Sequence, residues 1–174
     1  MDLNRLHRTA LTVADEAAQH AGTSGDVASA CAGWTVADVV RHLIAVQSLE
    51  ILGQPVATKP GDEGLADLDP DEVLPAWQAL VERLRAIKVD TAPPMLPSLD
   101  LLMHAWDIRQ GLHRAGLAGP LEFSDDILEV LEDYRARAPE DKIRTPEIFG
   151  PEQQAPDDAT RTQRFMAWTG RHVD

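Results

Sequence analysis

The sequence predicts an all-α protein, and three observations lead to that prediction. Apolar residues recur at intervals of three and four along most of the 174 residues, which is the spacing of an amphipathic helix. Residue types that cap helices stand before several of these segments, and glycine or proline follows them. Alternation of apolar and polar residues, which is typical of a half-buried strand, never persists beyond a few positions. We therefore expect a helical bundle.

The first two helices are expected over residues 2–21 and 36–52. Leucine and alanine recur along the first segment, and Gly22 follows it where a C-terminal glycine belongs. Thr35 begins the sequence TVAD, a short-armed variant of the capping box that opens many helices. Trp34 directly precedes this cap, so it is expected to pack against the second helix as a hydrophobic staple.

Two more helices are expected in the middle of the chain. Asp69 and Pro70 combine a cap with a first-turn proline and predict the start of the third helix. Pro75 then requires this helix to begin later or to bend at its first turn. After a proline-rich break, Ser98 is expected to cap the fourth helix, which spans 99–115.

The remaining segments combine loops with two shorter helices. Residues 54–64 are rich in proline, glycine and charge, and we expect them to form a loop. Ser124 is expected to cap a fifth helix, with acidic residues in its first turn and arginines in its last. Residues 139–157 look irregular, and 157–172 are expected to end in a short helix packed across the bundle as a strap.

The length and the hydrophobic content of 44% suit one domain over residues 1–174. Within it, we expect a core bundle over about 2–116 and a C-terminal helix and strap over 117–174. The tryptophan and methionine residues expected on the outside of this bundle favour a homodimer.

The charge and the single cysteine exclude several classes of protein. Lysine and arginine total 16 against 29 aspartate and glutamate, and the net charge of −13 would repel phosphate backbones and anionic lipids. We therefore expect neither nucleic acid nor a membrane as a partner. No apolar run approaches the roughly 20 residues of a membrane span, and no signal peptide is evident, so a cytoplasmic location is expected. The one cysteine, Cys31, excludes an internal disulfide framework and a cysteine-rich zinc site.

Three polar residues share one side of the fourth expected helix: Asp100, His104 and Asp107. The i, i+4 spacing of Asp100 and His104 points both side chains at a common spot, where they could share a metal ion. His42 lies among apolar residues of the second helix, so packing of the second helix against the fourth would bring it there too. Two imidazoles and one carboxylate leave coordination positions open, which is the pattern of a catalytic metal site.

A metal-free interpretation accounts for the same residues. A histidine on an apolar helix face, such as His42, is more often a hydrogen-bonded core residue than a ligand. Asp100 would suit the first turn of its helix, and Asp107 could pair with a cation or hydrogen-bond to His104. Cys31 is expected to be a small buried filler. Four further histidines are expected at solvated or terminal positions: His7, His20, His113 and His172.

The segments CAGWTVADVVRHL (31–43) and DLLMHAWDIRQGLHRAG (100–116) together resemble one branch of a known superfamily. They are similar to the actinobacterial branch of the DinB-like four-helix-bundle superfamily. This branch is related to the N-terminal, metal-binding domain of mycothiol-dependent maleylpyruvate isomerase. The tail, residues 149–171, resembles the closing segment of small single-domain members.

The resemblance implies a divalent metal, most often zinc or nickel, held by His42, Asp100 and His104. Because the acidic ligand is glutamate in the isomerase branch and histidine in many relatives, Asp107 is an alternative acidic ligand or a residue that orients one. The resemblance further implies a metal-activated low-molecular-weight thiol, such as mycothiol, for S-transfer or isomerisation of a small electrophile. The catalytic residues and the substrate are not predicted. The alternative is a non-catalytic helical bundle that binds a small ligand or a metal.

Overall fold

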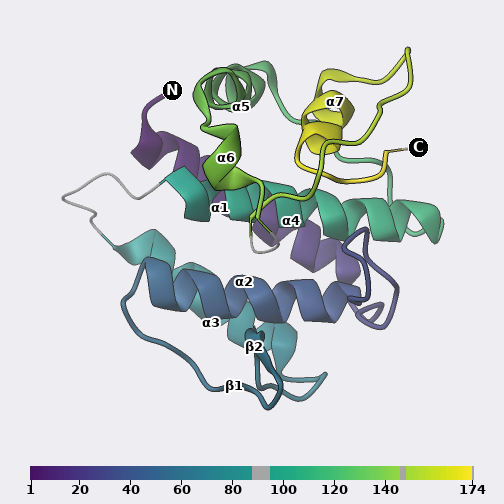
Figure 1. The fold of residues 1–174 in the computed structure, drawn as a ribbon. Coiled ribbons are helices and arrows are strands. Elements are labelled where there is room, and N and C mark those ends of the chain that lie inside the picture. The colour runs from purple at the N-terminus through teal and green to yellow at the C-terminus, as the bar shows by residue number, and fades with distance from the viewer. Residues whose placement is uncertain (88–94, 146–147, 174) are drawn as a thin grey trace. The chain divides into compact units, whose positions relative to one another are not determined.

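The computed structural model describes residues 1–87, 95–145 and 148–173 (Figure 1). Helices predominate in these residues, and the named strands form one two-stranded sheet, so the all-α class is confirmed. Among the described residues, no helix has both the length and the apolar composition needed to cross a bilayer. The chain divides into two compact units, 2–121 and 122–174, near the expected end of the core bundle. The single domain and the cytoplasmic location stay predictions.

The first two helices lie where the sequence predicts them. Helix α1 spans Leu3–Ala21 and ends at Gly22, whose φ of 49° is readily available only to glycine. Helix α2 spans Val36–Glu50 and begins with the complete capping box. The Thr35 side chain accepts a hydrogen bond from the backbone N–H of Asp38, and the Asp38 carboxylate accepts one from the backbone N–H of Thr35. Local sequence therefore determines where α1 ends and where α2 begins.

The next two helices begin at other residues than expected. Helix α3 spans Val73–Ala86, later than the Asp-Pro pair, so Pro75 falls in its first turn, where a missing N–H costs no hydrogen bond. Helix α4 spans Met95–Arg114. The expected cap at Ser98 is wrong because the helix already includes that residue, whose hydroxyl instead lies 3.2 Å from Nδ1 of His7. The expected solvated position of His7 is also wrong, since its side chain is buried.

A small hairpin replaces part of the loop expected over 54–64. Strand β1 (Thr58–Lys59) pairs antiparallel with β2 (Asp62–Ala66), and Gly61 turns the chain between them with a φ of 82°. Leu65 is buried, so the hairpin contributes to the core. A two-residue strand is too short to produce an alternating pattern, which explains why the sequence predicted no strand here.

The four long helices of residues 2–121 enclose one core. Helix α1 packs against α3 and α4, and α2 packs against α3, α4 and β2. Many apolar side chains along these helices are fully buried, including Leu6, Ala10, Val39, Leu43, Trp77, Leu99, Leu101, Ile108 and Leu112. The apolar faces read from the sequence therefore meet in one interior, as the hydrophobic effect requires.

The large side chains expected on the outer surface are mostly inside. Three of the four tryptophans are buried, namely Trp77, Trp106 and Trp168, and so are Met103 and Met166. The homodimer stays a prediction, but these residues no longer support it.

The described residues of the second unit, 122–145 and 148–173, contain three helices: α5 (Asp125–Arg137), α6 (Glu140–Ile143) and α7 (Arg161–Trp168). The fifth helix and the closing helix are thus confirmed, with α5 packed against α7. The single turn of α6 lies within the stretch that the sequence predicted as irregular. Packing of the closing helix across the bundle stays a prediction.

Trp168 is the centre of this unit. Its ring packs against those of Phe149 and Phe165, with centroids 5.2 and 5.5 Å away. The guanidinium of Arg144 lies 5.1 Å from the ring centroid, and the indole N–H donates to Glu140 at 3.2 Å. The indole ring is therefore packed against aromatic rings and a guanidinium, and its N–H group has a hydrogen-bond acceptor.

Candidate metal centre

The packing of α2 against α4 brings three of the predicted residues together. Nε2 of His42 and Nε2 of His104 each lie 3.4 Å from Oδ1 of Asp100. The two imidazole rings meet edge to face, with centroids 4.8 Å apart. One ligand atom from each residue lies within 4.8 Å of the other two. The three side chains thus converge as the sequence predicts, while their role as metal ligands stays a prediction.

Both imidazoles are oriented by hydrogen bonds on their far side. Nδ1 of His42 lies 3.1 Å from the carbonyl oxygen of Gly64, and Nδ1 of His104 lies 2.9 Å from Oδ2 of Asp107. A carbonyl or carboxylate oxygen only accepts, so each Nδ1 carries the hydrogen and donates it. When the rings are neutral, both Nε2 lone pairs therefore point to the same place, as they do in metal-binding histidines. Asp107 takes the orienting position that the sequence left open for it.

Polar contacts between α2 and the hairpin region hold Gly64 where its carbonyl oxygen accepts from His42. Arg41 is buried; its Nε donates to the carbonyl of Leu68 at 3.2 Å and its Nη1 to Asp38 at 3.0 Å. Lys59 of β1 reaches the same Asp38 carboxylate at 3.3 Å. One carboxylate near the start of α2 thus binds a cation from its own helix and one from the hairpin. This support could not be predicted from the sequence, because the residues of the hairpin are expected to form a loop.

The donor set fits a divalent cation. Oδ2 of Asp100 is buried and has no hydrogen-bond partner among the described residues, although buried carboxylate oxygens normally accept at least one hydrogen bond. A cation beside this oxygen would provide the missing partner. Two imidazole nitrogens and a carboxylate oxygen are donors that suit zinc and neighbouring transition metals.

Charge also concentrates at this point. Burial by itself would raise the pKa of the Asp100 carboxyl, but attraction and hydrogen bonds from His104 and His42 hold it well below its usual range. Burial by itself would lower the pKa of His104, but the carboxylates of Asp100 and Asp107 raise it to about 9. At neutral pH the metal-free site therefore holds an imidazolium between two carboxylates. The positive charge of His104 contributes its full stabilisation of the fold below pH 6.5, as long as the carboxylates stay ionised. This contribution falls as the pH rises above 6.5 and is lost as the pH passes through about 9.

Zinc binding at neutral pH is expected to release one proton from His104. A metal ion needs the Nε2 lone pair, and with a pKa of about 9 that nitrogen is protonated in the metal-free protein. Isothermal calorimetry in two buffers with different ionisation enthalpies measures the number of protons released. The number of protons that His104 releases should fall towards zero as the pH rises above about 9. A number of released protons that stays constant from neutral pH to above 9 would contradict His104 as their source.

Trp34 covers one side of the two imidazoles. Its ring centroid lies 5.1 Å from that of His42 and 6.1 Å from that of His104. The sequence predicted only a staple for this residue, because nothing local indicates that the loop before α2 reaches α4. The backbone does reach it, since the N–H of Ala30 donates to the carbonyl oxygen of Asp107 at 3.0 Å.

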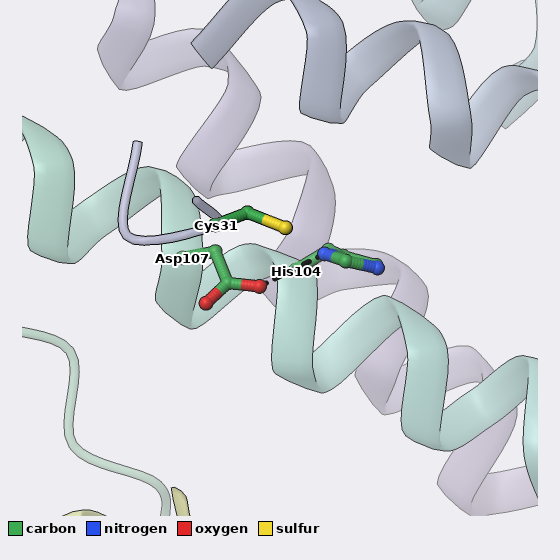
Figure 2. Close-up of side chains that lie close together, drawn as sticks. All are labelled: Cys31, His104 and Asp107. Carbon is green, nitrogen blue, oxygen red and sulfur yellow. Dashed lines mark hydrogen bonds and ion pairs between the residues drawn. The ribbon is translucent and has the colours of Figure 1, made fainter. Parts of the chain in front are cut away.

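Cys31 lies on the same loop and forms a second group of donors (Figure 2). One ligand atom each from Cys31, His104 and Asp107 lies within 4.8 Å of the other two. The thiol is half-buried, so the expected role as a buried filler misses its position beside two polar side chains. Sequence reasoning could not find this group because more than seventy positions separate the cysteine from the histidine.

A shallow hollow borders the site on the hairpin side. It is mostly apolar, and it is lined by Ala45, Val46, Leu49, Glu50, Pro55, Val56, Thr58 and Gly64. Gly64 belongs both to this lining and to the hydrogen bond that orients His42. Its lining does not include His42, Asp100 or His104, and Gly64 lies on the side of the His42 ring that faces away from Asp100.

Comparisons of the chain with protein-family models, with curated proteins and with solved structures found no match.

Proposed function

We propose that the protein is a divalent-metal-dependent enzyme that activates a low-molecular-weight thiol. The observation that carries this proposal is the convergence of His42, Asp100 and His104, with both Nδ1 atoms engaged elsewhere. Three protein ligands leave a coordination position for a substrate atom. A zinc or nickel ion bound there supplies a Lewis acid that lowers the pKa of a thiol, so a thiolate is available at neutral pH.

The resemblance of 31–43 and 100–116 to the DinB-like four-helix-bundle superfamily supports the same proposal. The superfamily's metal-binding histidine and its paired ligands match His42, Asp100 and His104 in this chain. Its mycothiol-dependent branch makes mycothiol the first thiol to test.

The residues around the three ligands have distinct tasks in this proposal. Asp107 and the carbonyl of Gly64 hold the two imidazoles in the orientation that exposes Nε2. Trp34 shields one side of both rings from water.

The reaction forms a bond between the thiolate sulfur and an electrophilic carbon of the substrate. If the electrophile is a conjugated double bond, addition allows rotation, and elimination then breaks the S–C bond and returns the isomer with the thiol. If the sulfur stays attached, the carbanion formed by the addition takes up a proton from solvent, which replaces the one that the thiol lost, and the product is an S-conjugate. Either outcome uses the same site, and the substrate decides between them.

A non-catalytic role in binding a small ligand or a metal is the second candidate. It is favoured by the contacts of Asp100, whose Oδ1 lies 3.4 Å from Nε2 of each imidazole and can form ion pairs with them. Such a group of charges can exist as a structural element of the core.

The test is a comparison of metal content with thiol chemistry, using protein purified without a histidine tag. Loaded with zinc or nickel and incubated with mycothiol and a panel of electrophiles, the wild type is expected to form an S-conjugate or an isomer. His42→Ala should lower this activity on the order of 100-fold or more, because it removes a ligand rather than a residue that only orients one. His113→Ala, at an exposed position of α4, is the matched control and should retain activity.

Two results would separate the candidates. Bound metal without any thiol-dependent product would contradict the enzyme and favour the binding role. Equal activity in His42→Ala and wild type would remove the proposed centre from the reaction.

A further inference from the structure

We infer that Cys31, His104 and Asp107 form a second cation position, which shares His104 with the first and offers a thiolate. The inference rests on the proposed metal-binding role of His104. A single divalent ion would then occupy one position or the other, and the softness of the ion would decide which.

The three side chains come from two elements that face each other. Figure 2 shows Cys31 extending its sulfur from the loop before α2 toward the ring of His104, with Asp107 on the adjoining turn of α4. His104 is 7% exposed and Asp107 is fully buried, whereas Cys31 is half-buried. The position is therefore enclosed on the side of the helix, and the residue that completes it from the loop is partly exposed.

Backbone hydrogen bonds hold the loop that carries Cys31 against α4. The N–H of Ala30 donates to the carbonyl oxygen of Asp107 at 3.0 Å, which ties the loop to α4 one residue before Cys31. The hydroxyl of Ser29 accepts from the N–H of Cys31 at 3.1 Å and lies 2.9 Å from the carbonyl of Trp34, to which it donates. The loop is thus preorganised, and binding would need little backbone rearrangement.

The close approach of the loop depends on a glycine in α4. A Cβ on Gly111 would lie 2.4 Å from the carbonyl oxygen of Ala28 and 2.8 Å from Cα of Ser29. Any side chain at this position would push the loop away from the helix. Gly111 therefore allows a cysteine from one element to lie beside a histidine from another.

The two positions differ in the chemistry of their donors. The first offers two imidazoles and a carboxylate, whereas the second offers a thiolate, an imidazole and a carboxylate. Thiolate sulfur favours soft or borderline ions such as Cd²⁺, Zn²⁺ and Co²⁺ over Mg²⁺ or Mn²⁺. Binding in the second position would form a metal–sulfur bond and release two protons to solvent, one from the thiol and one from the His104 nitrogen that becomes a ligand.

Occupation of one position excludes the other. In the first, the Asp107 carboxylate accepts the Nδ1 hydrogen of His104. In the second, the same carboxylate is a ligand itself. An ion bound at Cys31 is withdrawn from His42 and Asp100, so the choice of position would regulate the thiol activation proposed above.

Cobalt spectroscopy on the whole chain tests this inference, because a Co²⁺–thiolate bond gives an intense near-ultraviolet charge-transfer band. Wild-type protein titrated with Co²⁺ is expected to show this band. Cys31→Ser should lose it yet still bind Co²⁺ through the first position, as seen in the visible ligand-field bands. His42→Ala should keep the charge-transfer band, because the second position does not use that residue. Thermal unfolding of each variant establishes that it is folded.

The outcomes separate this inference from the proposed function. A charge-transfer band of equal strength in Cys31→Ser and wild type, or its absence while Co²⁺ is bound, overturns the second position alone. Loss of the band in folded His42→Ala would show that cobalt binding at Cys31 requires His42, and it overturns the second position as a site distinct from the first. If the bands behave as expected but no thiol reacts with any electrophile, the proposed function fails and the second position stands.

Discussion

His104→Ala is expected to abolish stoichiometric binding of zinc or nickel, the largest effect on metal binding of any single substitution in this protein. His104 is the one residue that belongs to both groups of candidate ligands in the described part of the chain. Its removal leaves two donors in each group, too few for a catalytic or structural zinc site. Elemental analysis after loading and dialysis measures the result. One equivalent of metal retained by the variant would contradict both positions.

Two further variants provide a comparison for the metal binding of His104→Ala. Asp107→Asn keeps the shape of the side chain but weakens the acceptor that orients His104, so a loss of about 10–100-fold in metal affinity is expected. His113→Ala removes an exposed imidazole from the same helix and should bind metal like the wild type. This order of effects, with His104→Ala the most severe, distinguishes a specific centre from general disturbance of α4.

Gly111→Ala is expected to lower the free energy of unfolding by about 1–3 kcal/mol, the typical cost of overpacking. The added Cβ would lie 2.4 Å from the backbone oxygen of Ala28, and neither backbone can yield without moving the loop or the helix. This clash should outweigh the advantage of about 1 kcal/mol that alanine has over glycine inside a helix. Urea unfolding of metal-free protein gives the difference.

Gly119→Ala provides the matched control for this substitution. No atom lies within 4 Å of a Cβ built at Gly119, so a change below about 1 kcal/mol is expected. Equal stability of the two variants would show that the loop before α2 does not pack tightly on α4. Gly111→Ala should also weaken the cobalt–thiolate band, because the displaced loop carries Cys31.

Helix capping illustrates what could be read from the sequence and what could not. The capping box at Thr35 and the terminal glycine at Gly22 act through neighbours a few positions away, so their consequences were predictable. Ser98 looked like a cap by the same logic, yet α4 begins at Met95 and the hydroxyl faces His7 of another helix. A local preference for capping yielded to the packing of α1 against α4.

The sequence by itself determined the helical class and the presence of Asp100 and His104 on one helix face. Helical periodicity is a local property, and four residues along a helix always return to nearly the same direction. Only the tertiary structure decided that His42 meets them and that Cys31 lies beside His104. These contacts join elements distant in the chain, and they depend on how helices and loops pack, including the close approach that Gly111 permits. No periodicity or spacing in the sequence encodes the distance between the loop before α2 and helix α4.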